Sequence, residues 1–280
     1  MIRTVIAAVG LNALLLLRGQ RFPLDLRSWQ PLIVIGLGNT LIPFLLITWG
    51  EKSVPSGIAA VLNATTTFFS LVIAHYVQMD ERITIKKVAG LVVGFAGVLV
   101  LMSRSETEST VSDVALWGQV AIVAAALFYA VFTNYSKKVI RNQFDPMVVS
   151  AGAMSVTAVS AIILTFASPY FGGPEPVALG DLSSRVLGAA LVLGFVNTLV
   201  AYMIYYWLVS DLGAARSSMV AYIIPPVGLF LGVLFLSEPL DIWLIVGAVL
   251  IFAGIGIVNL RFFRQRQSPP LVAAQPVDRG

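Results

Sequence analysis

Cysteine is absent from the 280-residue sequence, and histidine occurs once, at His75. These absences exclude a disulfide framework, a thiolate metal site, a cysteine nucleophile and a metal site built on several histidines. Charged residues are also scarce, at 11% of the chain, whereas soluble domains contain about 25%. With 58% hydrophobic residues and a mean hydropathy of +0.89, the composition predicts a multi-span membrane protein, and we expect no cofactor.

Long apolar runs separate the few charged residues. A helix needs about 20 residues to cross a bilayer, and lipid offers no hydrogen-bond partner to any other backbone conformation. We therefore predict an all-α integral membrane protein with about nine transmembrane helices, at residues 2–17, 30–49, 55–78, 86–103, 115–135, 147–167, 187–208, 214–236 and 242–260. The first run could instead be the core of a signal peptide, but no small-residue cleavage site follows it.

The loops between these runs differ in charge. Most of the 18 basic residues fall on one side of the predicted bundle, together with the C-terminus, and Arg3 is among the few on the other side. Because cytoplasmic loops carry an excess of Lys and Arg, the basic side is predicted to be cytoplasmic. We expect a multi-pass protein of the inner or plasma membrane, with a disordered cytoplasmic tail at 261–280.

Two parts of the sequence repeat each other. The segment "GLGNTL" at 36–41 returns as "GFVNTL" at 194–199, and "ERITIKKVAGLVVGFAG" at 81–97 aligns with "EPLDIWLIVGAVLIFAG" at 238–254. An odd number of predicted spans separates the copies, so the second copy is inverted in the membrane. Such inverted repeats place a shared binding site near the bilayer midplane, and rocking of the two halves gives alternating access.

These repeated segments, together with "AYIIPPVGLFLGVLFLSEPL" at 221–240, resemble the EamA family of the drug/metabolite transporter superfamily. The resemblance extends from residue 1 to about 260 and implies a five-plus-five helix fold that exports or imports small metabolites. The sequence departs from this pattern because it begins at the family's second helix, so we expect a mis-set start or a fragment. A second departure is Thr66-Thr67, where the family has a proline that Pro225 supplies in the second copy.

The resemblance implies four segments of the chain. A truncated first repeat of four helices is expected at 1–103, an outer loop at 104–114, a second repeat of five helices at 115–260 and the tail at 261–280. Glycines recur on the last helix of each repeat, where they would let neighbouring backbones approach closely. The predicted packing glycines are Gly90, Gly94, Gly97, Gly247 and Gly254.

Polar residues inside the apolar runs are the candidates for a substrate site. A polar group in lipid costs free energy unless it finds a partner or faces water. The candidate substrate-binding residues are Asn39, Thr40, Asn63, Thr67, Asn197, Thr198, Tyr202, Ser218 and Tyr222. In this interpretation Asn63 and Thr67 share a helix face. The alternative for each is a hydrogen bond that joins neighbouring helices.

Three prolines and the histidine are further candidates. Pro43, Pro225 and Pro226 each remove a helical N–H and expose a carbonyl, which predicts a helix break or gate. Their alternative role is a kink that serves packing alone. His75 lies towards the cytoplasmic end of its predicted helix, where it could couple protons, or could be a solvated helix-end residue.

No charged residue falls in the middle of a predicted helix, which argues against a permanently anionic substrate. We expect a secondary transporter, not an enzyme, that moves a small neutral, zwitterionic or amphipathic metabolite, amino-acid-like or drug-like, in the direction of efflux. Its partners would be this substrate and the lipid bilayer, with a homodimer as an option and no nucleic acid. The alternatives are a non-transporting scaffold or fragment, and a membrane enzyme, which would need a nucleophile, acid/base pair or metal cluster.

Overall fold

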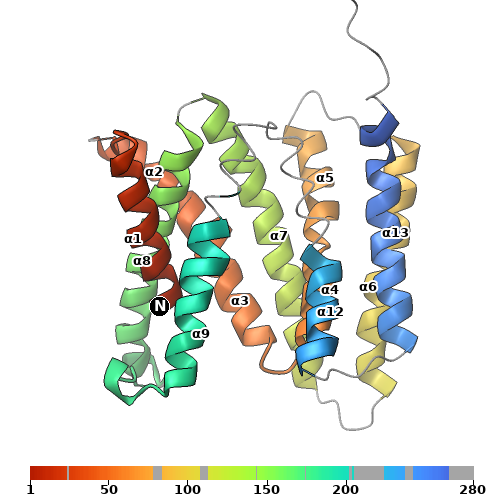
Figure 1. Cartoon of the computed structure of the whole chain (residues 1–280). Helices are drawn as coiled ribbons and strands as arrows, with labels where there is room; N and C mark the ends of the chain where they lie inside the picture. The colour runs from red at the N-terminus through yellow and green to blue at the C-terminus, as the bar shows by residue number, and fades with distance from the viewer. Residues whose placement is uncertain are drawn as a thin grey trace, which may run out of the picture.

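The computed structural model describes residues 1–23, 25–77, 84–107, 113–142, 144–173, 175–201, 204, 224–236 and 242–264. All regular structure in these ranges is helical, which confirms the predicted fold class (Figure 1). The elements are α1 (Ile2–Leu17), α2 (Leu26–Gly36), η1 (Leu37–Leu41), α3 (Ile42–Gly50), α4 (Ser56–Asn63), α5 (Thr66–Val77), α6 (Ile85–Thr107), α7 (Asp113–Asn142), α8 (Pro146–Ala167), η2 (Ser168–Phe171), η3 (Leu179–Asp181), α9 (Ser184–Gly194), η4 (Phe195–Val200), α12 (Ile224–Leu236) and α13 (Ile242–Arg264).

Four helical stretches of the described chain are long and apolar enough to cross a membrane. They are Arg27–Gly50, Ser56–Ile73, Val114–Ile140 and Pro146–Phe171. Shorter apolar helices occupy Ile2–Leu17, Ser184–Val200 and Ile242–Ile257. The predicted helical runs therefore match helices wherever the chain is described, whereas a total of nine spans stays a prediction.

The run predicted as one regular helix at 55–78 is divided in two. At the division, the N–H groups of Ala64 and Thr65 donate to carbonyls three residues back instead of four, each at 3.1 Å. The hydroxyls of Thr65 and Thr66 also donate to carbonyls three residues back, each at 2.7 Å. Threonine side chains compete with the helical backbone in this way. Asn63 and Thr67 therefore lie on either side of this division, and their predicted common face stays a prediction.

Two carboxylates, those of Asp25 and Asp145, begin helices at the ends of the bundle. The Asp25 carboxylate accepts from the Ser28 N–H at 3.0 Å, at the start of α2. The Asp145 carboxylate accepts from the Met147 N–H at 2.7 Å, at the start of α8. Each satisfies an N–H that has no partner within the helix. These carboxylates therefore lie at helix ends, away from the middle of the apolar spans.

The repeated segments run in opposite directions through the bundle. In Figure 1, α2, η1 and α3 run downwards, whereas α9 runs upwards; α6 runs downwards and α13 upwards. A Cβ atom added to Gly254 would lie 2.6 Å from the carbonyl oxygen of Gly90, and one added to Gly97 would lie 2.7 Å from that of Gly247. Gly90 aligns with Gly247 and Gly97 with Gly254, so exchanging the repeats exchanges these two contacts. The glycines pack α6 against α13 about an approximate two-fold axis.

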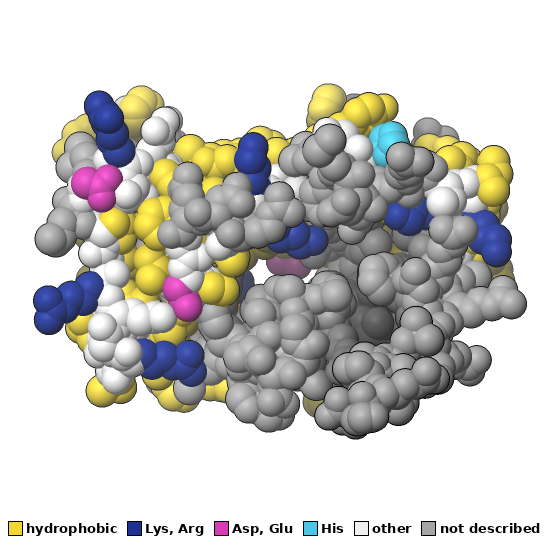
Figure 2. Space-filling view, turned by 90° about the horizontal axis from the view of Figure 1, so that it is seen from above, with side chains coloured by type: hydrophobic (Ala, Val, Ile, Leu, Met, Phe, Trp, Pro, Cys, Tyr) yellow, Lys and Arg dark blue, Asp and Glu magenta, His cyan; other side chains and the backbone are white. Residues whose placement is uncertain are grey.

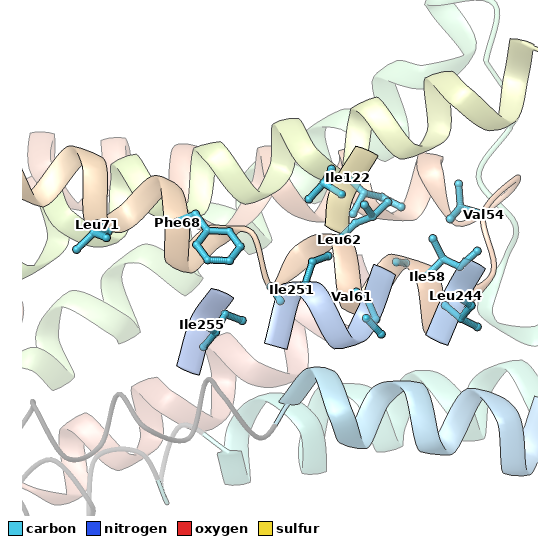
Figure 3. Packing of buried hydrophobic residues seen from close by; sticks show 14 residues of the cluster. Val54, Ile58, Val61, Leu62, Phe68, Leu71, Ile122, Leu244, Ile251 and Ile255 are labelled. Atoms are coloured by element: carbon cyan, nitrogen blue, oxygen red, sulfur yellow. The ribbon is translucent and has the colours of Figure 1, made fainter. Parts of the chain in front are cut away.

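Three apolar clusters hold the helices together. The largest joins α4 and α5 to α6, α7 and α13, and Figure 3 shows Phe68 among its buried side chains. The second joins α1 and α8 to Leu199 of η4, and the third joins α2, α7 and α8. In Figure 1, α1, α8 and α9 lie at one side and α6, α12 and α13 at the other. Helices α3 and α7 lie between them.

Candidate functional site

The repeated Gly-x-x-Asn-Thr-Leu segment contains a π-helical turn in both copies. In the first copy η1 contains Asn39 and Thr40, and the Ile42 N–H donates to the Leu37 carbonyl, five residues back. In the second copy η4 contains Asn197 and Thr198, and Ala201 donates in the same way to Val196. Such turns are rare and are often found at functional sites. The polar interruption of the sequence therefore specifies the same backbone distortion twice.

The two π turns have different local causes. Pro43 is the second residue of α3, two positions after η1 ends, and its ring would clash with the carbonyl of Asn39 in a regular α-helix. The second copy has Ala201 at the corresponding position. There the Thr198 hydroxyl donates to the Leu193 carbonyl, five residues back, at 2.9 Å. A proline in one copy and a threonine hydroxyl in the other favour the same geometry.

Each π turn packs against a helix of the opposite repeat. A Cβ atom added to Gly36 would lie 2.6 Å from the Ala153 carbonyl oxygen of α8, and one added to Gly194 would lie 3.1 Å from the Arg3 carbonyl oxygen of α1. The Gly36 carbonyl also accepts from the Thr157 hydroxyl at 2.9 Å. These reciprocal contacts place Ala153 and Arg3 at corresponding positions of the two halves.

Helix α7 covers the first π turn. The Thr133 hydroxyl donates to the side-chain carbonyl of Asn39 at 3.0 Å, and Gly38 lies directly against the ring of Phe132. Asn39 is half-buried, and Thr40 is buried, with 4% of its surface exposed. Asn39 therefore joins two helices, as the alternative interpretation of the sequence predicted, beside any contact it makes with a substrate.

The second π turn is in contact with Arg3. The Arg3 Nε donates to the Thr198 hydroxyl at 3.1 Å, and the Arg3 guanidinium carbon lies 4.2 Å from the centre of the Phe44 ring. Thr198 is 2% exposed, whereas Asn197 is exposed. Arg3, which the sequence analysis counted with the outer side, is the second residue of α1, and its side chain contacts both repeats. Figure 1 shows the N-terminus partway along the height of the bundle.

A second group of polar side chains lies at the break between α4 and α5. The Asn63 side-chain oxygen is buried and has no hydrogen-bond partner among the described residues. Thr67, one turn further along, is half-buried. Ser70 accepts from the side-chain amide of Asn134 of α7 at 2.9 Å, and Asn134 is 1% exposed. Asn63 therefore keeps a buried acceptor for which the described residues supply no donor.

Thr133 and Asn134 were missed by the sequence analysis. They form a polar pair near the end of the apolar run predicted at 115–135, which is the signal that could have identified them. That run has no counterpart in the repeat, so recurrence does not mark its polar residues. Their contacts with Asn39 and Ser70 make α7 the helix that links η1 to α5.

The other predicted site residues lie elsewhere. His75 is exposed, its ring centre lies 5.2 Å from that of Tyr76, and Figure 2 shows it on the face seen from above. Pro225 and Pro226 lie in the first turn of α12, where proline is tolerated. Tyr202, Ser218 and Tyr222 lie outside the described residues. Within the described ranges no three His, Cys, Asp or Glu residues are grouped so that they could hold a metal ion.

Comparisons with known proteins agree with this architecture. The EamA-like transporter family matches residues 1–103 and 116–260. An uncharacterized transporter, YoaV of Bacillus subtilis, is 26% identical over 95% of this chain and 87% of its own length. A probable amino-acid metabolite efflux pump of Salmonella typhimurium is 28% identical over 84% of this chain and 77% of its own length.

A solved crystal structure shares the fold. It superimposes with a TM-score of 0.63 at 21% identity, covering 95% of this chain and 87% of its own. The family match includes both copies of the repeat, and the relatives are described as transporters and efflux pumps rather than enzymes. The chain therefore belongs to the EamA-like transporter family, whose members are membrane proteins.

Proposed function

We propose that the chain is a secondary transporter that exports a small neutral, zwitterionic or amphipathic metabolite by alternating access. The observation that carries the proposal is the pair of π turns, η1 and η4, on segments that run in opposite directions. Inverted repeats with irregular helices at such positions place substrate sites between the halves. The substrate would bind between these two turns.

The contacts of the π turns support a pathway that opens alternately to each side. Each turn rests on the opposite repeat, through Gly36 on α8 and Gly194 on α1. A small rotation of one half would therefore change the surroundings of both turns together. The glycine contact between α6 and α13 lies near the approximate two-fold axis and would allow such movement without large side chains in the way.

The polar groups around the turns support a small polar substrate rather than a large charged one. Hydroxyls and an amide, those of Thr40, Thr198 and Asn39, lie next to aromatic and aliphatic side chains, and the charged side chain of Arg3 touches the second turn. The description of a relative as an amino-acid metabolite efflux pump agrees with this chemistry. The excess of basic residues on one side supports a cytoplasmic C-terminus in the cell membrane.

Export of labelled amino acids from loaded cells tests the proposal. We expect Asn39→Ala, which removes the acceptor of the Thr133 hydroxyl, and Asn197→Ala, which removes an exposed amide of the second π turn, each to reduce the rate of export by about 10-fold. Thr165→Ala is the matched control, because its hydroxyl donates only within the last turn of α8, to Ala161. Unchanged export by both asparagine variants, at normal protein levels, would contradict a site between the π turns.

A non-transporting scaffold is the alternative to be separated from this proposal. A transporter binds its substrate and is stabilised as the ligand concentration rises, by mass action. A scaffold would gain no stability from any member of a panel of amino acids and small metabolites. Thermal unfolding of the purified chain with this panel distinguishes the two.

A further inference from the structure

Arg3 is a positively charged side chain held at the contact between the two repeats. We propose that its guanidinium binds the carboxylate of the transported substrate and selects carboxylate-bearing, amino-acid-like molecules. This inference rests on the transport function proposed above and assigns its specificity to one residue. It also replaces the expectation that no basic group is available to an anionic part of the substrate.

The geometry leaves part of the guanidinium available for a ligand. Its Nε–H is used by Thr198 at 3.1 Å, and one of its faces lies over Phe44 at 4.2 Å. An arginine carries five N–H donors in a planar fork, and within the described residues the four on the two terminal nitrogens of Arg3 make no hydrogen bond. This fork matches the two oxygens of a carboxylate. Thr198 and Phe44 fix its position from opposite repeats.

The charge on Arg3 has no partner of opposite sign in the described part of the chain. Its contacts there are a neutral hydroxyl and an aromatic ring, and it has no ion pair among the described residues. Asp25 and Asp145 begin helices, and Glu175 lies in a loop. An ionisable group within a membrane-spanning helix is costly unless it is paired, and such groups mark substrate pathways. A substrate carboxylate would supply the missing charge.

The two halves differ at this position. Ala153 packs on Gly36 as Arg3 packs on Gly194, so the corresponding place in the other half carries no charge. One arginine side chain at an otherwise nearly symmetric contact fits a substrate with one carboxylate. The apolar surroundings on the other side would accept the rest of the molecule.

Paired ligands test this assignment in the purified full-length chain. The probes are L-leucine, L-phenylalanine and L-threonine, each compared with its carboxamide, which lacks the carboxylate charge. We expect the wild-type chain to be stabilised at about 10- to 100-fold lower concentrations by an acid than by its amide. Arg3→Gln should remove this preference while binding of the amide is kept, and Arg3→Lys should keep only part of it.

Arg18→Gln is the matched control, since Arg18 is exposed directly after the other end of α1. Its preference for the acid should equal that of the wild type. If wild type binds acids and amides equally, or if Arg3→Gln keeps the full preference, Arg3 does not bind the carboxylate, and the transport proposal stands. If Arg3→Gln does not fold, Arg3→Lys decides: an unchanged preference overturns the assignment. If neither acids nor amides bind, carboxylate recognition fails, and the export assay judges transport separately.

Discussion

The buried side chain of Thr198 makes two hydrogen bonds with different consequences. The Thr198 hydroxyl donates to the Leu193 carbonyl at 2.9 Å and accepts from Arg3 at 3.1 Å. It thereby joins the π turn to a carbonyl of the preceding helix and orients a charge from the other repeat. A polar residue buried in a membrane span is tolerated when all of its hydrogen bonds are made within the protein. Thr198 meets this condition, whereas Asn63 leaves its oxygen without a partner among the described residues.

Asp25, just before the start of α2, makes a pH-dependent contribution to the stability of the folded protein. Hydrogen bonds from the hydroxyl and N–H of Ser28 lower the pKa of its carboxyl group below 3.8. Because the pKa of Asp25 is lower in the folded state than in the unfolded state, its ionised carboxylate stabilises the fold at any pH above the unfolded pKa near 3.8. This stabilisation is lost as the pH falls through the lower pKa of the folded state. We expect Asp25→Ala to be less stable than wild type at pH 7, with the difference vanishing in stronger acid. Thermal unfolding of both proteins from pH 7 to pH 2.5 measures this, and a constant difference would contradict it.

Candidate site residues could be predicted from the sequence more easily than the partners that they contact. The polar residues Asn39 and Thr198 stand out in apolar runs and recur in the repeat. Their partners, Thr133 and Arg3, do not stand out: one lies in an unrepeated helix, and the other lies where hydropathy places the end of a span. The chemistry of a side chain is local, whereas its partner depends on how helices far apart in sequence pack.

Among the elements, the π turns and the glycine contacts set how closely the helices approach. Gly36 and Gly194 let η1 and η4 rest on α8 and α1 without a side chain between them. The sequence indicated a break near Pro43, but the second turn forms without a proline. Likewise, the division between α4 and α5 arises from threonine hydroxyls, which hydropathy does not register. Hydropathy therefore located the helices and missed three of their distortions.

Replacing a glycine by alanine should destabilise the protein where that glycine touches another helix, and should not destabilise it where the space beside the glycine is open. A Cβ atom at Gly36 would lie 2.6 Å from the Ala153 carbonyl oxygen. This oxygen belongs to the backbone, so it cannot move aside as the end of a flexible side chain could. We expect Gly36→Ala to lower the free energy of unfolding by about 1–3 kcal/mol, the typical cost of overpacking. Gly188→Ala in α9 is the control, because nothing lies within 4 Å of its added Cβ.

The control should be neutral or stabilising by up to ~1 kcal/mol, since alanine favours a helix over glycine. Chemical denaturation of the purified proteins measures both variants. Equal stabilities for Gly36→Ala and Gly188→Ala would show that η1 does not rest on α8 as closely as the structure indicates.

At the scale of the whole molecule, inversion of the repeat is the property on which transport depends. The reciprocal glycine contacts of α6 and α13 relate the halves by an approximate two-fold axis, and the segments run in opposite directions in Figure 1. The sequence could predict this inversion from the repeat and the number of intervening spans. It could not predict which residues meet at the axis, because the offset between copies says nothing about their distance.

The absence of cysteine allows this inversion to be tested directly in membranes. Glu81 and Glu238 occupy corresponding places in the two copies and lie outside the described residues. A single cysteine can replace either, as Glu81→Cys or Glu238→Cys, with no background thiol in the chain. A membrane-impermeant maleimide added to intact cells should label Glu238→Cys and should label Glu81→Cys only after the cells are permeabilised. Labelling of both variants from the same side would show that the two copies have the same orientation, and alternating access between inverted halves would then have no structural basis.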